Sequence, residues 1–124
     1  MLSITESKEN YLKTIYTLDP CREGARVTDI ADALNVTKAS ASRAVSELEK
    51  EGYVDRSNKR QVVLSESGFQ KACEIKNRYE IILLFLVEVL HVNGKASAQE
   101  ACKLEHVISD ATLKAMRYFL GEAV

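Results

Sequence analysis

Three side chains near the C-terminus offer a sulfur, an oxygen and a nitrogen donor at helical spacing: Cys102, Glu105 and His106. Positions i, i+3 and i+4 of a helix are surface neighbours, so a helix through this segment would place all three on one face. Divalent transition metals of soft or borderline character favour such mixed ligands. A helical Cys, however, is often only a small buried hydrophobe, and a Glu-His pair is often a solvated surface. Three ligands from one helix also leave a coordination sphere incomplete.

A capping pattern indicates the helix that must position these residues. Ser97 and Glu100 have the spacing of a capping box and predict that the helix begins at Ser97. A last helix is expected after Ser109, which can cap it. Its inward residues are predicted to be Leu113, Met116 and either Phe119 or Leu120.

The N-terminal half shows two short helices joined by a tight turn. Thr28 is expected to cap the first helix and Thr37 the second, which runs over about 38–51, with the turn at Asn35 and Val36. Small polar residues at the start of the second helix would let its backbone approach the floor of a DNA major groove. The pattern is typical of a helix-turn-helix, although an ordinary helical corner also produces it.

A basic hairpin is expected directly after the second helix. Two β-prone runs flank residues 57–60, whose Ser and Asn suit a turn. Its positive charge is typical of the wing of a winged-helix domain, although a solvated loop can be basic by chance. The surface predicted to contact double-stranded DNA comprises Thr28, Thr37, Lys38, Ala39, Ser40, Ser42, Arg43, Arg56, Lys59 and Arg60.

Two further helices are predicted. The first, over 5–18 and capped by Ser3 or Thr5, turns Tyr11, Leu12, Ile15 and Leu18 inward. A long helix capped by Ser65 is expected to reach about Leu90, and its segment 81–87 is apolar all round, which indicates burial on every side. A chain of 124 residues has little protein to cover such a segment, so an obligate homodimer is predicted.

Bulk properties restrict the class of protein. A 46% apolar composition with a single Pro favours an ordered, helix-rich fold, and a net charge of −1 means that DNA binding must rely on local basic patches. The spacing of the three cysteines resembles no disulfide framework, so a reducing cytoplasm is expected. We expect no membrane partner, because no signal-peptide segment is present and the longest apolar run is far shorter than the ~20 residues of a membrane span.

Together these residues resemble the diphtheria-toxin-repressor and manganese-repressor (DtxR/MntR) family of metal-dependent transcriptional regulators. The resemblance covers nearly the whole chain and is most specific in segments 9–16, 26–34 and 100–109. It implies a mainly α fold, with an N-terminal winged helix-turn-helix and its small β-hairpin wing over 1–70. A helical dimerisation and metal-binding domain is implied over 71–124.

The resemblance also implies site residues. Cys102, Glu105 and His106 match the metal ligands of the iron-responsive members, and Asn10 matches a fourth ligand position on the first helix, where Met or Asp is usual. Ligands of a second metal site are replaced, which implies a single metal ion per subunit. The replacing residues are Lys13, Tyr79, Leu83 and Ala98.

The resulting hypothesis is a metal-dependent repressor, not an enzyme, that binds a palindromic operator as a homodimer. Metal held by Asn10 and the Cys102 helix would fix the recognition helices at a spacing near one DNA turn, ~34 Å. The thiolate favours Fe²⁺, with Co²⁺, Ni²⁺, Zn²⁺ or Mn²⁺ able to substitute. One alternative is a metal-independent winged-helix regulator that responds to oxidation of Cys102. A remote alternative is a zinc hydrolase, for which the chain offers a single convincing His ligand.

Overall fold

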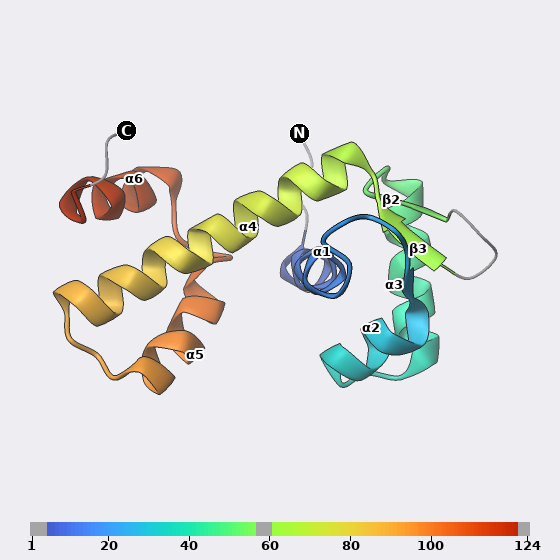
Figure 1. The fold of residues 1–124 in the computed structure, drawn as a ribbon, viewed down its shortest axis with the longest axis horizontal. Coiled ribbons are helices and arrows are strands. Elements are labelled where there is room, and N and C mark those ends of the chain that lie inside the picture. Colours follow the sequence, from blue (N-terminus) through green and yellow to red (C-terminus); the bar gives the residue numbers. More distant parts are fainter. Residues whose placement is uncertain (1–4, 57–60, 122–124) are drawn as a thin grey trace. The chain divides into compact units, whose positions relative to one another are not determined.

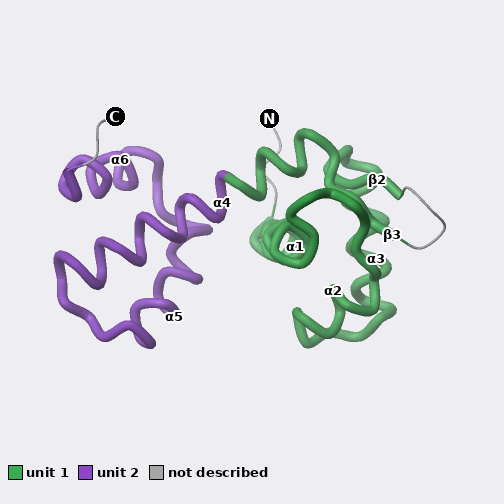
Figure 2. The backbone as a smooth tube through the Cα atoms, viewed as in Figure 1, with its two compact units in different colours: residues 1–73 green, residues 74–124 purple. Residues whose placement is uncertain are grey.

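The computed structural model describes residues 5–56 and 61–121 (Figure 1). The chain divides into two compact units, residues 1–73 (unit 1) and residues 74–124 (unit 2) (Figure 2). The described chain is mainly helical with a small antiparallel sheet, which confirms the predicted fold class. Within the described residues, no helix combines the length and the apolar character that crossing a bilayer requires.

Unit 1 begins with α1, Glu6–Leu18. Thr5 caps it by accepting a hydrogen bond from the backbone N–H of Lys8 at 3.3 Å, as predicted, while the other cap candidate, Ser3, lies outside the described residues. The prediction that Leu18 points inward is wrong, because its exposed fraction is 43%. The inward face consists of Tyr11, Leu12 and Ile15.

The two helices of the predicted helix-turn-helix are α2, Val27–Leu34, and α3, Lys38–Lys50. Asn35 ends α2 in the left-handed region, with φ 57° and ψ 46°. Thr37 caps α3 by accepting from the N–H of Ser40 at 3.1 Å, which confirms that prediction. The predicted cap of α2 is wrong: Thr28 lies inside the helix, and the N-cap residue is Arg26, whose side chain makes no cap hydrogen bond.

Three short antiparallel strands form the sheet of unit 1 in the order β1-β3-β2. They are β1 (Ala25–Arg26), β2 (Val54–Arg56) and β3 (Gln61–Leu64). β2 and β3 are the two strands of the predicted hairpin, and Val54 pairs with Leu64. The sequence did not predict β1, which pairs through Ala25 with Val62 of β3. The hairpin turn, 57–60, lies outside the described residues.

α4, Glu66–Leu84, starts in unit 1 and continues into unit 2. The hydroxyl of Ser65 accepts from the N–H of Gly68 at 3.1 Å and donates to the carbonyl of Gly52 at 2.6 Å. The first of these bonds supports the predicted cap at Ser65. Gly68 lies so close to the neighbouring backbone that a Cβ there would meet the carbonyl oxygen of Tyr53 at 1.9 Å.

The long helix ends at Leu90 as predicted, but it is not α-helical throughout. α4 ends at Leu84, and a π-helical segment, η1, covers Phe85–Val89. The start of α5, Gly94–Leu104, is also earlier than expected, because Asn93 caps it by accepting from the N–H of Ala96 at 2.9 Å. Ser97 is instead fully buried inside α5.

α6, Asp110–Phe119, begins at the predicted cap, where the hydroxyl of Ser109 accepts from the N–H of Thr112 at 3.2 Å. The small core of unit 2 lies between α4, α5 and α6, and it uses one buried leucine of α6 as predicted. Its buried members are Ile81, Ile82, Ala101 and Leu113, and Met116 and Leu120 pack against them.

Candidate functional site

The exposed face of α3 carries five of the residues predicted to contact DNA. Lys38, Ala39, Ser40, Ser42 and Arg43 are all exposed. On the opposite face, the buried residues of α3 pack into the core of unit 1. The small and cationic side chains of α3 therefore face solvent. The buried residues are Ala41, Val45 and Leu48.

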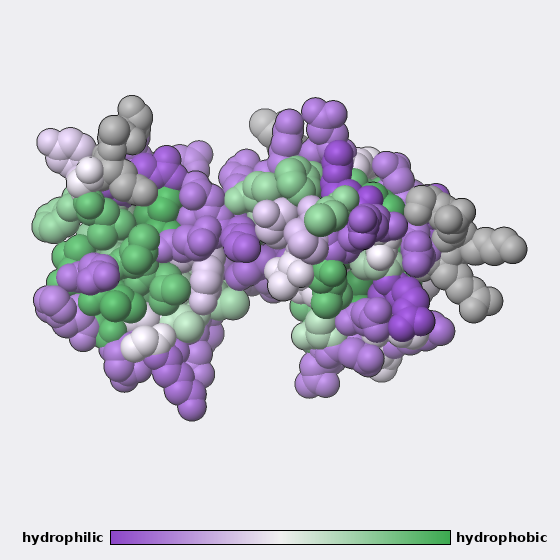
Figure 3. Space-filling view, in the orientation of Figure 1, coloured by the Kyte–Doolittle hydropathy of each residue, from purple (hydrophilic) through white to green (hydrophobic). Residues whose placement is uncertain are grey.

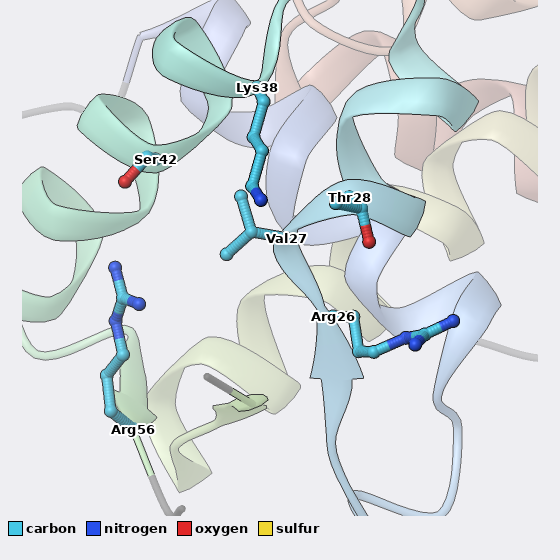
Figure 4. A pocket seen from close by; sticks show the side chains of 6 residues that line it. All are labelled: Arg26, Val27, Thr28, Lys38, Ser42 and Arg56. Atoms are coloured by element: carbon cyan, nitrogen blue, oxygen red, sulfur yellow. The ribbon is translucent and has the colours of Figure 1, made fainter. Parts of the chain in front are cut away.

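A hollow of about 430 Å³ opens beside this face, where the first turns of α2 and α3 meet β2. Figure 4 shows the ammonium of Lys38 directed toward the start of α2 and the guanidinium of Arg56 directed toward Ser42, whereas Arg26 points away. Helix N-termini and cations both favour anions, so the hollow suits a phosphate group. The lining residues are Arg26, Val27, Thr28, Lys38, Ser42 and Arg56.

Acidic neighbours balance part of this positive charge. Arg56 Nε lies 3.8 Å from a carboxylate oxygen of Glu49, and Arg26 Nε lies 3.5 Å from Asp29. Both pairs are partly or largely exposed, so each contributes little to stability and a phosphate can compete with the carboxylates. Sequence reasoning missed Arg26, because β1 places it at the hollow by pairing with a distant strand. Lys59 and Arg60, the other predicted wing residues, lie outside the described residues.

Lys8 connects α1 to α3 within unit 1. Its Nζ donates to a carboxylate oxygen of Glu51 at 2.9 Å and lies 3.3 Å from Glu47. The hydrogen bond from Lys8 to Glu51 raises the pKa of the Lys8 ammonium. The contact fixes α1, which carries the predicted ligand Asn10, against the helix predicted to enter DNA. Asn10 itself is half-buried and borders a second hollow of about 340 Å³.

The three predicted ligands of unit 2 do not lie on one regular helix. α5 ends at Leu104, Glu105 is its C-cap residue, and His106 lies in the turn that follows. Glu105 Oε2 lies 3.3 Å from His106 Nε2, and the two side chains are 0% and 3% exposed, whereas Cys102 is an exposed thiol. No three His, Cys, Asp or Glu side chains in the described part of the chain lie close enough together to hold a metal ion.

The structure therefore brings together two of the predicted ligands. A carboxylate removed from water requires a compensating positive charge or hydrogen bonds. The oxygen and nitrogen donors of Glu105 and His106 fit a borderline divalent cation, which would supply that charge. Cys102 lies in the last turn of α5, three residues before Glu105.

An apolar surface lies on unit 2. Five large hydrophobic side chains, on α4, after η1, after α5 and on α6, have exposed fractions between 47% and 76%. Figure 3 shows apolar residues gathered over one face of this unit. An exposed patch of this kind is typical of a surface that another subunit covers. The five exposed side chains are Leu84, Leu90, Val107, Tyr118 and Phe119.

Comparison with known proteins gives two consecutive matches to family profiles. Residues 3–62 match the iron dependent repressor N-terminal DNA binding domain, and residues 65–123 match the iron dependent repressor metal binding and dimerisation domain. Together the two profiles cover nearly the whole chain.

Individual proteins that this chain resembles are consistent with the two family profiles. An uncharacterised HTH-type transcriptional regulator of Methanocaldococcus jannaschii is 31% identical over 118 residues, 94% of each chain. The HTH-type transcriptional regulator MntR of Oceanobacillus iheyensis is 33% identical over 105 residues, which are 85% of this chain and 71% of MntR. The solved structure of the manganese regulator SloR has a TM-score of 0.81 at 29% identity, over 95% of this chain. The match covers 55% of SloR, so this chain spans about half the length of that protein.

The matched family and the described geometry agree in both units. The helix-turn-helix and the strands of the wing lie in the part that matches the DNA-binding domain, and the Glu105–His106 pair lies in the part that matches the metal-binding domain. Members of the family are transcriptional regulators rather than enzymes. The chain belongs to the iron-dependent repressor family of metal-dependent, DNA-binding transcriptional repressors.

Proposed function

We propose that this protein is an iron-responsive repressor that binds a palindromic operator as a homodimer when a divalent metal is bound. The proposal rests first on the buried pair of Glu105 and His106, which places an oxygen and a nitrogen donor side by side. It assigns DNA binding to residues 1–70 and metal binding with dimerisation to residues 71–124. A cytoplasmic location, where thiols stay reduced, belongs to the same proposal.

Glu105 and His106 form the core of the proposed metal site. Cys102 becomes the third ligand when its thiol ionises, and Asn10 contributes a neutral side-chain oxygen as the fourth. The metal supplies a positive charge that compensates the buried carboxylate. Thiolate and imidazole donors favour Fe²⁺ over Mn²⁺, and Co²⁺, Ni²⁺ and Zn²⁺ are expected to substitute.

Ligands contributed by both units provide the proposed link to DNA. Asn10 lies on α1, whereas the other three proposed ligands lie on α5 or directly after it. Simultaneous ligation would therefore restrict the motion of one unit relative to the other. DNA binding favours this metal-bound arrangement if it holds the two recognition helices of a dimer ~34 Å apart, which is one turn of DNA. Metal and DNA affinity are then coupled, and each raises the other by the same factor.

The DNA surface of the proposal combines the exposed face of α3 with the hollow beside it. Lys38, Arg56 and the hydroxyl of Thr28 line the hollow and are assigned to phosphate contacts. Ser40, Ser42 and Arg43 lie on the exposed face of α3 and are assigned to contacts with base edges in the major groove. Thr37 and Ala39 border this helix start, and Lys59 and Arg60 stay predicted wing contacts.

Cobalt titration followed by visible absorption tests the proposed ligand set. Wild-type protein is expected to bind one Co²⁺ per subunit with an intense thiolate-to-metal band, and Cys102→Ser is expected to lose that band. Affinity should rise with pH, because the bound metal displaces the thiol proton. Absence of cobalt binding in the wild type would contradict the proposal. The rival then favoured is a metal-independent regulator that responds to oxidation of Cys102, whose side chain is exposed.

A further inference from the structure

Arg78 of α4 makes three contacts with the segment that joins α5 to α6. Its Nε donates to the backbone carbonyl of Glu105 at 2.9 Å, one terminal nitrogen donates to the carbonyl of Ile108, and the other lies 2.8 Å from a carboxylate oxygen of Asp110. The Arg78 side chain is 13% exposed, so it is largely shielded from solvent. One guanidinium thus contacts the C-cap residue of α5, the turn after it and the first residue of α6.

These contacts hold the backbone on both sides of His106. The last carbonyls of a helix have no partner within the helix, and Arg78 satisfies that of Glu105, where α5 ends. The second carbonyl, of Ile108, lies beyond His106 along the chain. With both carbonyls bound to one rigid group, the turn has little freedom to rotate the two side chains away from each other.

We propose that Arg78 is a positioning residue for Glu105 and His106, acting through the backbone of the turn that carries them. The inference rests on the proposed metal site and adds a residue that the metal need not touch. Hydrogen bonds behind a ligand fix its orientation, and their loss typically lowers metal affinity about 10–100-fold.

The role is specific to arginine. A guanidinium presents its donors in a rigid planar fork, which matches two carbonyls and a carboxylate at once. Lysine keeps the charge but concentrates its donors at a single flexible atom, so it cannot reach all three acceptors with good geometry. Arg78→Lys therefore removes the positioning and keeps the charge in the segment.

The test compares Arg78→Lys and Arg78→Met with the wild type by cobalt titration, visible absorption and circular dichroism. Arg117→Lys is the matched control, because it makes the same substitution on α6, outside the turn. We expect Arg78→Lys to keep its helix content, to bind Co²⁺ about 10–100-fold more weakly and to change the shape of the cobalt spectrum. The control is expected to match the wild type.

Each alternative outcome is distinguishable. A folded Arg78→Lys protein with wild-type affinity and spectrum would overturn the positioning role and leave the metal site intact. Unfolding of both Arg78 variants would also overturn it, because Arg78 would then be needed for the fold itself. A wild type that binds no cobalt would contradict the proposed metal site, and with it the role of Arg78.

Discussion

Glu105 and His106 are neighbours in sequence, yet Glu105 Oε2 and His106 Nε2 lie only 3.3 Å apart and both side chains are buried. Adjacent residues of a regular helix point about 100° apart, so such a contact is not a property of a helix. It depends on the chain leaving α5 after Leu104. The turn between α5 and α6 is therefore as important to the proposed metal site as the ligands themselves.

The first prediction concerns the charge of Glu105. Glu105→Gln keeps the volume of the side chain and removes its negative charge, so metal affinity is expected to fall at least tenfold, about 1.4 kcal/mol. Competition with a chromophoric chelator measures the change. The control is Glu100→Gln, an exposed position on the same helix, which should bind as the wild type does. Equal affinities in the two variants would remove Glu105 from the ligand set.

The second prediction concerns phosphate contacts at the hollow. Lys38→Ala and Arg56→Ala are each expected to weaken binding to all DNA sequences alike and to reduce the log–log salt slope by about 0.9. Arg43→Ala should instead lose roughly 1–3 kcal/mol of discrimination between operator and random DNA. Fluorescence anisotropy over a range of salt concentrations separates the two effects. Lys114→Ala, in unit 2, is the charge-matched control, and a slope unchanged in the hollow variants would refute their assignment.

The third prediction concerns the close approach at Gly68. Alanine normally stabilises a helix relative to glycine by up to about 1 kcal/mol. At Gly68, however, the new Cβ would lie 1.9 Å from the carbonyl oxygen of Tyr53, and backbone must move. Gly68→Ala is expected to lower the free energy of unfolding by about 1–3 kcal/mol in urea denaturation. Gly94→Ala, whose Cβ would meet no atom within 4 Å, should be neutral or stabilising.

The fourth prediction concerns the apolar surface of unit 2. Leu84 is 47% exposed in the single chain, and a second subunit is expected to cover it. Leu84→Asp should therefore give insoluble or monomeric protein that does not bind DNA, whereas the wild type should sediment as a dimer at micromolar concentration. Leu18→Asp, at an exposed leucine of unit 1, is the matched control and should stay dimeric. A monomeric wild type would contradict the predicted homodimer.

Much of the fold could be predicted because the interactions that define its helices join residues close together in the sequence. Thr5, Thr37 and Ser109 each cap a helix by accepting from the N–H three residues later, a relationship that is visible in sequence. The buried stripe of α3 follows from its helical period in the same way. The cap of α5 was predicted wrongly, because Ser97 and Glu100 have the spacing of a capping box and the structure uses Asn93 instead. Packing buries Ser97, and its hydroxyl donates to the carbonyl of Val92 at 3.1 Å.

Features with distant partners were missed. β1 is only two residues long, and it is a strand because β3 pairs with it. Arg78 lies more than twenty residues before Glu105 in the sequence, yet it binds the carbonyl of Glu105 where α5 ends. No local pattern reports either relationship. The donor types at 102, 105 and 106 were visible in the sequence, but the close pairing of Glu105 with His106 was not.

Metal-dependent repression requires that DNA affinity differ with and without bound metal. Anisotropy titrations of operator DNA are made at fixed salt, with Fe²⁺ under anaerobic conditions or with chelator, on the wild type and on Glu105→Gln. We expect Fe²⁺ to tighten DNA binding by the wild type at least tenfold and to leave the DNA affinity of Glu105→Gln unchanged. Wild-type affinity that is the same with Fe²⁺ and with chelator would contradict metal-dependent repression by this protein.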